Sequence, residues 1–166
     1  MSHPAFREAD GSDWAAIWPI VAEVVRTGDT YALPPDISEE AACIAWMPDP
    51  EAGRRTFVAV VDDAVVGTAY LRPNLPGPGD HVANAGWMIA PTHEGRGVGR
   101  AFAEHVIEEA RRSGYTAMQF NAVVALNRRA IALWKSLGFQ VVGTVPGAFR
   151  HPVGGLTGVH VMHREL

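Results

Sequence analysis

The sequence predicts a single α/β domain built on one mixed sheet. Two observations support this fold class. Short β-rich runs alternate with stretches whose apolar residues recur at helical spacing, which gives the order β-α-α-β-β-β-α-β-α-β-β over residues 1–166. The composition, with 48% hydrophobic and 19% charged residues in a chain of 166, is ordinary for one globular domain.

The first third of the chain predicts one strand and two helices. Residues 6–9 alternate in polarity and form a short first strand. Ser12 or Asp13 then caps a helix with apolar residues at helical spacing, in which Pro19 predicts a kink or a break. After a loop, a second short helix is expected from Ser38 to about residue 46.

A β-hairpin and a further strand follow. Residues 56–61 and 64–71 are β-rich, and the two aspartates at 62–63 between them form a tight turn. Residues 73–80 are rich in proline and glycine and are expected to be a loop. Residues 81–90 then form the fourth strand.

The next segments alternate between helix and strand. A helix with apolar residues on one face ends at Gly114, after two arginines in its last turn. Residues 116–123 form the fifth strand, and Asn127 caps the following helix, which ends at Gly138.

The C-terminal part predicts two strands separated by a loop. Residues 139–145 and 158–164 are expected to be strands six and seven. Residues 147–155 contain three glycines and a proline and are expected to form a mobile, partly basic loop.

The most informative segment is the glycine-rich turn at residues 91–100, between the buried strand and the helix that follows it. Such a turn leaves backbone N–H groups unpaired at the positive end of the helix dipole, where phosphate binds well. Glycines let the backbone approach a ligand closely, and Arg96 and Arg100 add positive charge. The turn therefore predicts a phosphate site.

The nucleotide fingerprints do not fit this turn. A P-loop requires Gly-Lys-Ser/Thr at its end, which is missing here. A dinucleotide fingerprint requires glycine where Arg100 stands and an acidic residue about 20 positions later, where residues 119–121 are Gln, Phe and Asn.

A second motif narrows the ligand. Residues 127–139 have the pattern Asn-x-x-Ala-x-x-Leu-Trp-x-x-x-Gly-Phe. Together with the Gly-x-Gly-x-Gly turn, this segment resembles the GCN5-related N-acetyltransferase (GNAT) superfamily over roughly residues 84–147. The resemblance implies the GNAT fold, with a mostly antiparallel sheet of about seven strands and helices on both faces. It also implies acetyl-CoA as cosubstrate and an N-acetyltransferase activity.

The resemblance assigns a set of cofactor-binding residues. The strand before the turn would pair with the thioester and pantetheine, and backbone N–H groups of the turn would hold the pyrophosphate. Asn127 would contact the CoA arm, although helix capping alone also explains an asparagine there. The full set is Met88, Ile89, Gly95, Arg96, Gly97, Val98, Gly99, Arg100, Asn127 and Trp134.

Two residues depart from the family pattern. Glu94 stands where many members have arginine or glutamine, and a carboxylate near phosphate is repelled unless it points outward. Trp134 replaces the tyrosine that protonates the departing thiolate in much of the family, and an indole N–H only donates a hydrogen bond. The three tyrosines of the chain do not match that place in the pattern; they are Tyr31, Tyr70 and Tyr115. Either water or a group elsewhere in the chain supplies the proton.

A closer resemblance, to proline-analogue (azetidine-2-carboxylate) acetyltransferases, involves two asparagines. It implies that Asn84 binds the acceptor's carboxylate and that Asn121 serves catalysis. Asparagine is unfavourable within strands, so two asparagines at such positions require a reason. Substrate binding and catalysis are one reason, and a buried amide pair that satisfies backbone groups is the alternative. Arg150 is a candidate partner for a carboxylate substrate, or else a solvated side chain.

The remaining features of the sequence limit the partners and the location that we expect for the protein. The net charge of −4 argues against a general nucleic-acid binder. The single cysteine, Cys43, excludes an internal disulfide and a cysteine-based metal site, and no metal is expected. The N-terminus lacks a signal-peptide core and no run is long enough to span a membrane, so we expect a cytoplasmic protein. The family resemblance makes a homodimer an option.

The sequence therefore predicts direct attack of a small-molecule amine on acetyl-CoA in a ternary complex. An amino acid or a proline analogue is the expected acceptor. Two alternatives stay open: acetylation of a protein N-terminus or lysine, and a CoA-binding sensor with weak or lost catalysis.

Overall fold

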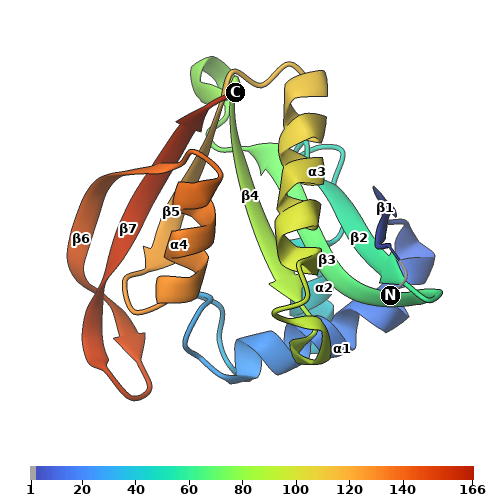
Figure 1. The fold of residues 1–166 in the computed structure, drawn as a ribbon, viewed down its shortest axis with the longest axis horizontal. Helices are drawn as coiled ribbons and strands as arrows, with labels where there is room; N and C mark the ends of the chain where they lie inside the picture. The colour runs from blue at the N-terminus through green and yellow to red at the C-terminus, as the bar shows by residue number, and fades with distance from the viewer. Residues whose placement is uncertain (1–2) are drawn as a thin grey trace.

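The computed structural model describes residues 3–166, which form one seven-stranded sheet in the order β1-β2-β3-β4-β5-β7-β6 (Figure 1). The strands are β1 (Ala5–Glu8), β2 (Arg55–Val61), β3 (Ala64–Pro73), β4 (Val82–Ile89), β5 (Ala117–Val124), β6 (Gln140–His151) and β7 (Gly155–Glu165). The α-helices are α1 (Trp14–Arg26), α2 (Glu39–Trp46), α3 (Val98–Arg112) and α4 (Arg128–Ser136). The predicted order of elements is confirmed.

The sheet opens between its two central strands. All neighbouring strands run antiparallel except β4 and β5, which are parallel. This parallel pair is joined only at Val82–Ala117 and Ala83–Met118, after which the strands diverge (Figure 1). The backbone of β4 beyond Ala83 therefore has no partner strand on its β5 side.

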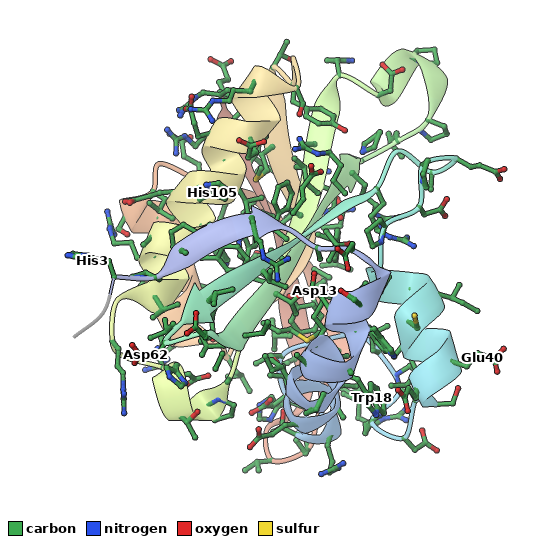
Figure 2. All side chains as sticks on the ribbon, turned by 90° about the vertical axis from the view of Figure 1, so that its right-hand side faces the viewer. His3, Asp13, Trp18, Glu40, Asp62 and His105 are labelled. Atoms are coloured by element: carbon green, nitrogen blue, oxygen red, sulfur yellow. The ribbon has the colours of Figure 1, made fainter. Side chains whose placement is uncertain are left out.

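Helices cover both faces of the sheet, as predicted. Figure 2 shows α3 with His105 on one side of the sheet, and α1 with Trp18 and α2 with Glu40 on the other. Buried residues of α3 and α4 share one core cluster with the sheet, and those of α1 and α2 share a second.

The first helix corrects one half of an expectation. A kink or a break was expected at Pro19, and no break occurs, because α1 continues through it from Trp14 to Arg26. Pro19 itself is exposed, while the buried side chains Ile17, Ile20 and Val21 hold the helix against the sheet. Burial of this face offsets the backbone hydrogen bond that proline removes.

The expected capping of α1 by Ser12 or Asp13 is wrong, because Asp13 makes no capping hydrogen bond and Asp10 caps the turn before the helix. Local signals do account for the starts of α2 and α4 and for the hairpin. The Ser38 side chain caps α2, and Asn127 caps α4 by accepting from the Ala130 N–H at 3.2 Å. Asp62 and Asp63 have φ angles of 50° and 61°, the left-handed values that a tight two-residue hairpin turn requires. These predictions are confirmed.

The C-terminal hairpin corrects a second expectation. Residues 147–155 were predicted to be a mobile loop, but β6 runs to His151 and β7 begins at Gly155. Phe149, although flanked by exposed residues, is buried together with Val124 and Val159. This contact, distant in sequence, anchors the hairpin against β5 and makes the strands longer than the local composition indicated.

Candidate functional site

A cavity of about 550 Å³ lies where β4 and β5 diverge. Its walls come from four places: the end of α1 with the loop after it, the end of β4, the glycine turn, and α4. Because α1 and α4 lie on opposite faces, the cavity reaches both sides of the sheet. Eight predicted cofactor residues line it: Met88, Ile89, Gly95, Gly97, Gly99, Arg100, Asn127 and Trp134.

The glycine turn has the backbone shape that a phosphate site requires. Gly95 and Gly97 adopt φ angles of 73° and 83°, which side chains disfavour. A Cβ at Gly97 would meet no atom within 4 Å, so the backbone there is open to a ligand. Since α3 begins at Val98, the N–H groups of its first turn have no acceptor within the helix. These donors point toward a ligand at the positive end of the helix.

Two predicted residues of the turn do not line the cavity. Arg96 is exposed to solvent, and the Val98 side chain is 6% exposed within the core beneath α3. Only the backbone of Val98 is therefore placed to contact a ligand at the helix start.

Ion pairs and polar contacts border the glycine-turn end of the cavity. The Glu94 carboxylate accepts a hydrogen bond from the Arg129 guanidinium at 2.6 Å, and both residues line the cavity. This pair places the acidic residue against a cation on α4. Arg100 donates to the Ser136 hydroxyl at 2.8 Å and pairs with Glu104 at 3.2 Å.

Trp134 closes one wall by packing against other aromatic rings. It is 8% exposed, and its ring centroid lies 4.8 Å from that of Trp87 and 4.7 Å from that of Phe120. The buried Nε1–H of Trp87 has no hydrogen-bond partner in the described part of the chain. An unsatisfied buried donor costs about 1–3 kcal/mol, so its position in a cavity wall is compatible with a ligand site.

The opposite wall contains a hydroxyl that sequence reasoning did not place there. Tyr31, in the loop after α1, donates a hydrogen bond from its hydroxyl to the Trp87 carbonyl oxygen at 2.7 Å. Burial raises the pKa of Tyr31 well above its ordinary value, and the nearby Tyr70 raises it further. The contact spans 56 residues of chain, so no local motif signals it.

Asn84 and Asn121 lie near each other in the sheet but do not line the cavity. Asn84 is buried, accepts from the Tyr70 hydroxyl at 3.1 Å, and donates to the Gln119 carbonyl at 3.0 Å. Asn121 is exposed, donates to the Asn74 side chain at 2.8 Å, and accepts from the Gln119 side chain at 2.9 Å. Gln119 therefore links the two predicted residues, and Asn84 also satisfies a backbone group at the diverging strands.

Arg150 is not brought to the cavity. It lies in β6 opposite Leu156, with its side chain exposed. The loop from which it was expected to reach a substrate is instead part of the hairpin.

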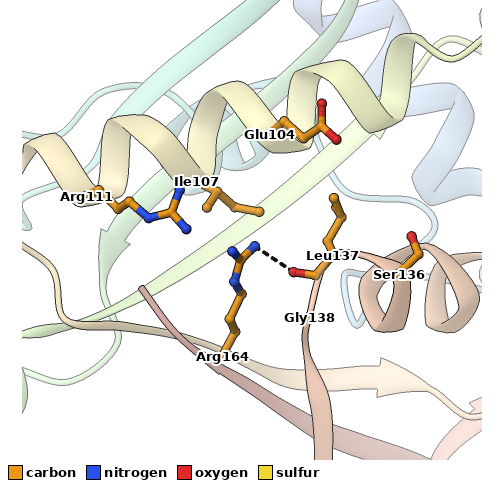
Figure 3. A pocket seen from close by; sticks show the side chains of 7 residues that line it. All are labelled: Glu104, Ile107, Arg111, Ser136, Leu137, Gly138 and Arg164. Carbon is orange, nitrogen blue, oxygen red and sulfur yellow. Dashed lines mark hydrogen bonds between the residues drawn. The ribbon is translucent and has the colours of Figure 1, made fainter.

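A second hollow of about 360 Å³ lies between α3, the end of α4 and β7 (Figure 3). There the Arg164 guanidinium donates to the Leu137 carbonyl at 2.6 Å, next to the end of α4. Burial lowers the pKa of Arg164, and Arg111 lowers it further. None of the predicted site residues lines this hollow.

Two other kinds of site are missing from residues 3–166. Within residues 3–166, no three histidine, cysteine, aspartate or glutamate side chains gather in a way that could hold a metal ion. No helix in the same range has the length and apolar character needed to cross a membrane.

Comparisons with known proteins agree with this geometry. Residues 18–139 match the model of the acetyltransferase (GNAT) family. A GCN5-related N-acetyltransferase from Kribbella flavida is 50% identical and superposes with a TM-score of 0.94, covering 98% of each chain. The acetyltransferase yncA from Salmonella typhimurium, solved with its cofactor acetyl-CoA, is 25% identical with a TM-score of 0.86, covering 99% of this chain and 95% of that one.

One curated relative matches over a shorter stretch. The N-acetyltransferase aca1 from Schizosaccharomyces pombe is 36% identical over 87 residues. That stretch is 52% of this chain and 42% of aca1, so the match spans less than half the length of this relative.

Proposed function

The chain belongs to the acetyltransferase (GNAT) family, whose cosubstrate is acetyl-CoA, and we propose that it acetylates the amine of a small molecule. An amino acid or a proline analogue is the acceptor class that we favour. We further propose that residues 1–166 act as one domain of a cytoplasmic enzyme, with a homodimer as its candidate assembly.

The observation that carries this proposal is a cavity reaching both faces of the sheet through the gap between β4 and β5. A transferase with a ternary complex must hold two substrates whose reacting ends meet. The glycine turn and α4 supply the end suited to phosphates, with Arg100 and Arg129 in its wall. The β4 backbone, which has no partner strand on the β5 side beyond Ala83, then supplies hydrogen-bonding groups for the pantetheine arm.

The other end of the cavity suits an amine. Glu23 and Asp29, at and after the end of α1, line that wall, and carboxylates attract an ammonium group before it loses its proton. The volume of about 550 Å³ falls in the range of pockets for small molecules. These features support a small acceptor over a folded protein.

The chemistry that this site supports is mostly positioning. Bound acetyl-CoA supplies the thioester, and the protein must align the amine with it and exclude water. Asn84 bonds to Tyr70, which packs against the core beneath α1 and α2, and Gln119 links Asn84 to Asn121 where the strands diverge. We propose that Asn84 contacts the acceptor and that Asn121 orients the reacting groups.

The test is a thiol-release assay with acetyl-CoA and a panel of proline analogues, amino acids, polyamines and peptides. We expect release with one small amine class. Asn121→Ala should slow release on the order of tenfold while leaving CoA affinity unchanged, because a lost positioning hydrogen bond is worth about 1 kcal/mol or more. Gln140→Ala, an exposed amide on β6, is the matched control.

Two results would replace the proposal. Release with peptides alone would favour the protein-acetylating alternative. CoA binding that raises the melting temperature, without release for any amine, would favour a sensor.

A further inference from the structure

The site has no acidic side chain on α4 to return a proton to the departing sulfur. Trp134 occupies the family's tyrosine position, and its indole N–H does not give up a proton at neutral pH. A tyrosine hydroxyl lies on the opposite wall of the cavity and is a candidate for this role. Tyr31 lines the same cavity as Trp134, but it enters from the α1 side.

The position of the Tyr31 hydroxyl is fixed by β4. It lies 2.7 Å from the Trp87 carbonyl oxygen, on the strand whose free backbone faces the gap. A Cβ added at Gly86 would lie 3.1 Å from the same hydroxyl, so it rests directly over the strand backbone. Its ring is held edge-on by Trp46, with centroids 5.9 Å apart. The hydroxyl is thus held at the backbone suited to the thioester, and its oxygen, which accepts no hydrogen bond from the described residues, can accept a proton.

We propose that Tyr31 is the proton-relay residue of acetyl transfer, a role that rests on the proposed function. The amine nitrogen forms the C–N bond, the C–S bond breaks, and its electron pair leaves with sulfur. Tyr31 gives its hydroxyl proton to sulfur and takes one proton from the amine nitrogen. The products are the amide and the free thiol of CoA, and the tyrosine is regenerated, so no further reactant is needed.

The environment of Tyr31 favours a relay over a stepwise acid. Burial raises the pKa of Tyr31, so a free tyrosinate is unfavourable and the hydroxyl stays protonated at neutral pH. Coupling the loss of one proton to the gain of another avoids that anion. The hydrogen bond to Trp87 holds the hydroxyl in place before the reaction, and the O–H turns from this carbonyl to sulfur as the oxygen takes the amine proton.

The test compares Tyr31→Phe with Tyr115→Phe. Tyr115 is half-buried near the start of β5 and outside the cavity, so it controls for the loss of a phenolic oxygen. We expect Tyr31→Phe to lower kcat on the order of 10²-fold, with the KM for acetyl-CoA within about twofold. Tyr115→Phe should change neither. Melting temperatures show whether both variants fold.

A binding measurement adds a readout independent of turnover. If the Tyr31 hydroxyl donates to sulfur, it stabilises the thiolate and lowers the thiol pKa of bound CoA. Thiolate absorbance during a pH titration should then show this pKa about one pH unit higher in Tyr31→Phe than in the wild type or Tyr115→Phe. A purely structural role for Tyr31 would not move it.

The outcomes separate this inference from the proposed function. A wild-type protein that transfers acetyl groups, with Tyr31→Phe equally fast and the thiol pKa unchanged, overturns the relay alone. A wild-type protein that releases no thiol with any amine overturns the proposed function and the relay with it. If Tyr31→Phe does not fold, the wild-type protein provides the second measurement: a thiol pKa of bound CoA that is no lower than that of free CoA overturns the relay.

Discussion

Replacing Gly86 by alanine tests the packing that holds Tyr31 and Tyr70 over β4. Gly86 pairs with Tyr70 across β3 and β4, and an added Cβ would lie 2.7 Å from Tyr70 Cε1 and 3.1 Å from the Tyr31 hydroxyl. Tyr70 cannot simply move aside, because its ring packs edge-on against Trp46 at 4.9 Å and its hydroxyl bonds to Asn84. The clash must therefore displace packed groups.

The size of the effect follows from overpacking. Inserting a methyl group into a packed site costs about 1–3 kcal/mol, and the smaller conformational freedom of alanine in the unfolded chain returns about 0.4–1 kcal/mol. A net loss of about 1–2 kcal/mol lowers the melting temperature of a chain of this length by about 2–8 °C. Acetyl transfer should also fall, since the Tyr31–Trp87 hydrogen bond is displaced.

The assay pairs thermal unfolding with thiol release, and Gly143→Ala is the control. Gly143 is also a strand glycine, but a Cβ there meets no atom within 4 Å. The melting temperature of Gly143→Ala should therefore stay unchanged or rise slightly. If Gly86→Ala melts within about 1 °C of Gly143→Ala and retains full activity, the steric reasoning is refuted.

Two further predictions concern charge. Glu94→Gln removes a carboxylate from the cavity wall and frees Arg129. The CoA affinity measured by calorimetry should therefore rise about fivefold at low salt, with a smaller gain at high salt. Weaker binding would mean instead that the ion pair holds the turn in shape. Burial lowers the pKa of His105 below its ordinary 6.5, so the folded chain binds fewer protons than the unfolded chain near that pH. Stability should therefore be retained above about pH 6.5 and lost as the pH falls below it. Between about pH 8 and about pH 5, the melting temperature of His105→Gln should decline less than that of the wild type. Equal declines in the two proteins would contradict this reasoning.

The sequence predicts the elements whose causes are local. The cap at Asn127, the aspartate turn at Asp62 and the glycines at 95 and 97 each depend on a few adjacent residues, and the structure shows all of them in the expected conformations. The glycine turn could be identified as a phosphate site for the same reason. Its chemistry is carried by backbone N–H groups, whose direction a helix start determines.

Tertiary contacts decided the features that the sequence did not reveal. The glycines near Arg150 indicated a loop, but burial of Phe149 against Val124 and Val159 extends the hairpin and leaves Arg150 exposed on β6. Pro19 indicated a helix break, but the apolar face of α1 is held by the sheet. In both places, packing between distant segments outweighs a local preference.

Under the proposed function, the two halves of the cavity differ in the same way, which bears on how an acceptor would be selected. The donor half consists of the glycine turn and α4, segments that a short motif specifies. The proposed acceptor half depends on Tyr31, which reaches β4 across 56 residues of chain, and on Glu23 and Asp29 in the same wall. Substitutions in the loop after α1 can therefore reshape the acceptor end without altering the backbone groups that hold the donor. The separation explains why the acetyl donor can be inferred from sequence, whereas the acceptor depends on a wall that only the folded chain assembles.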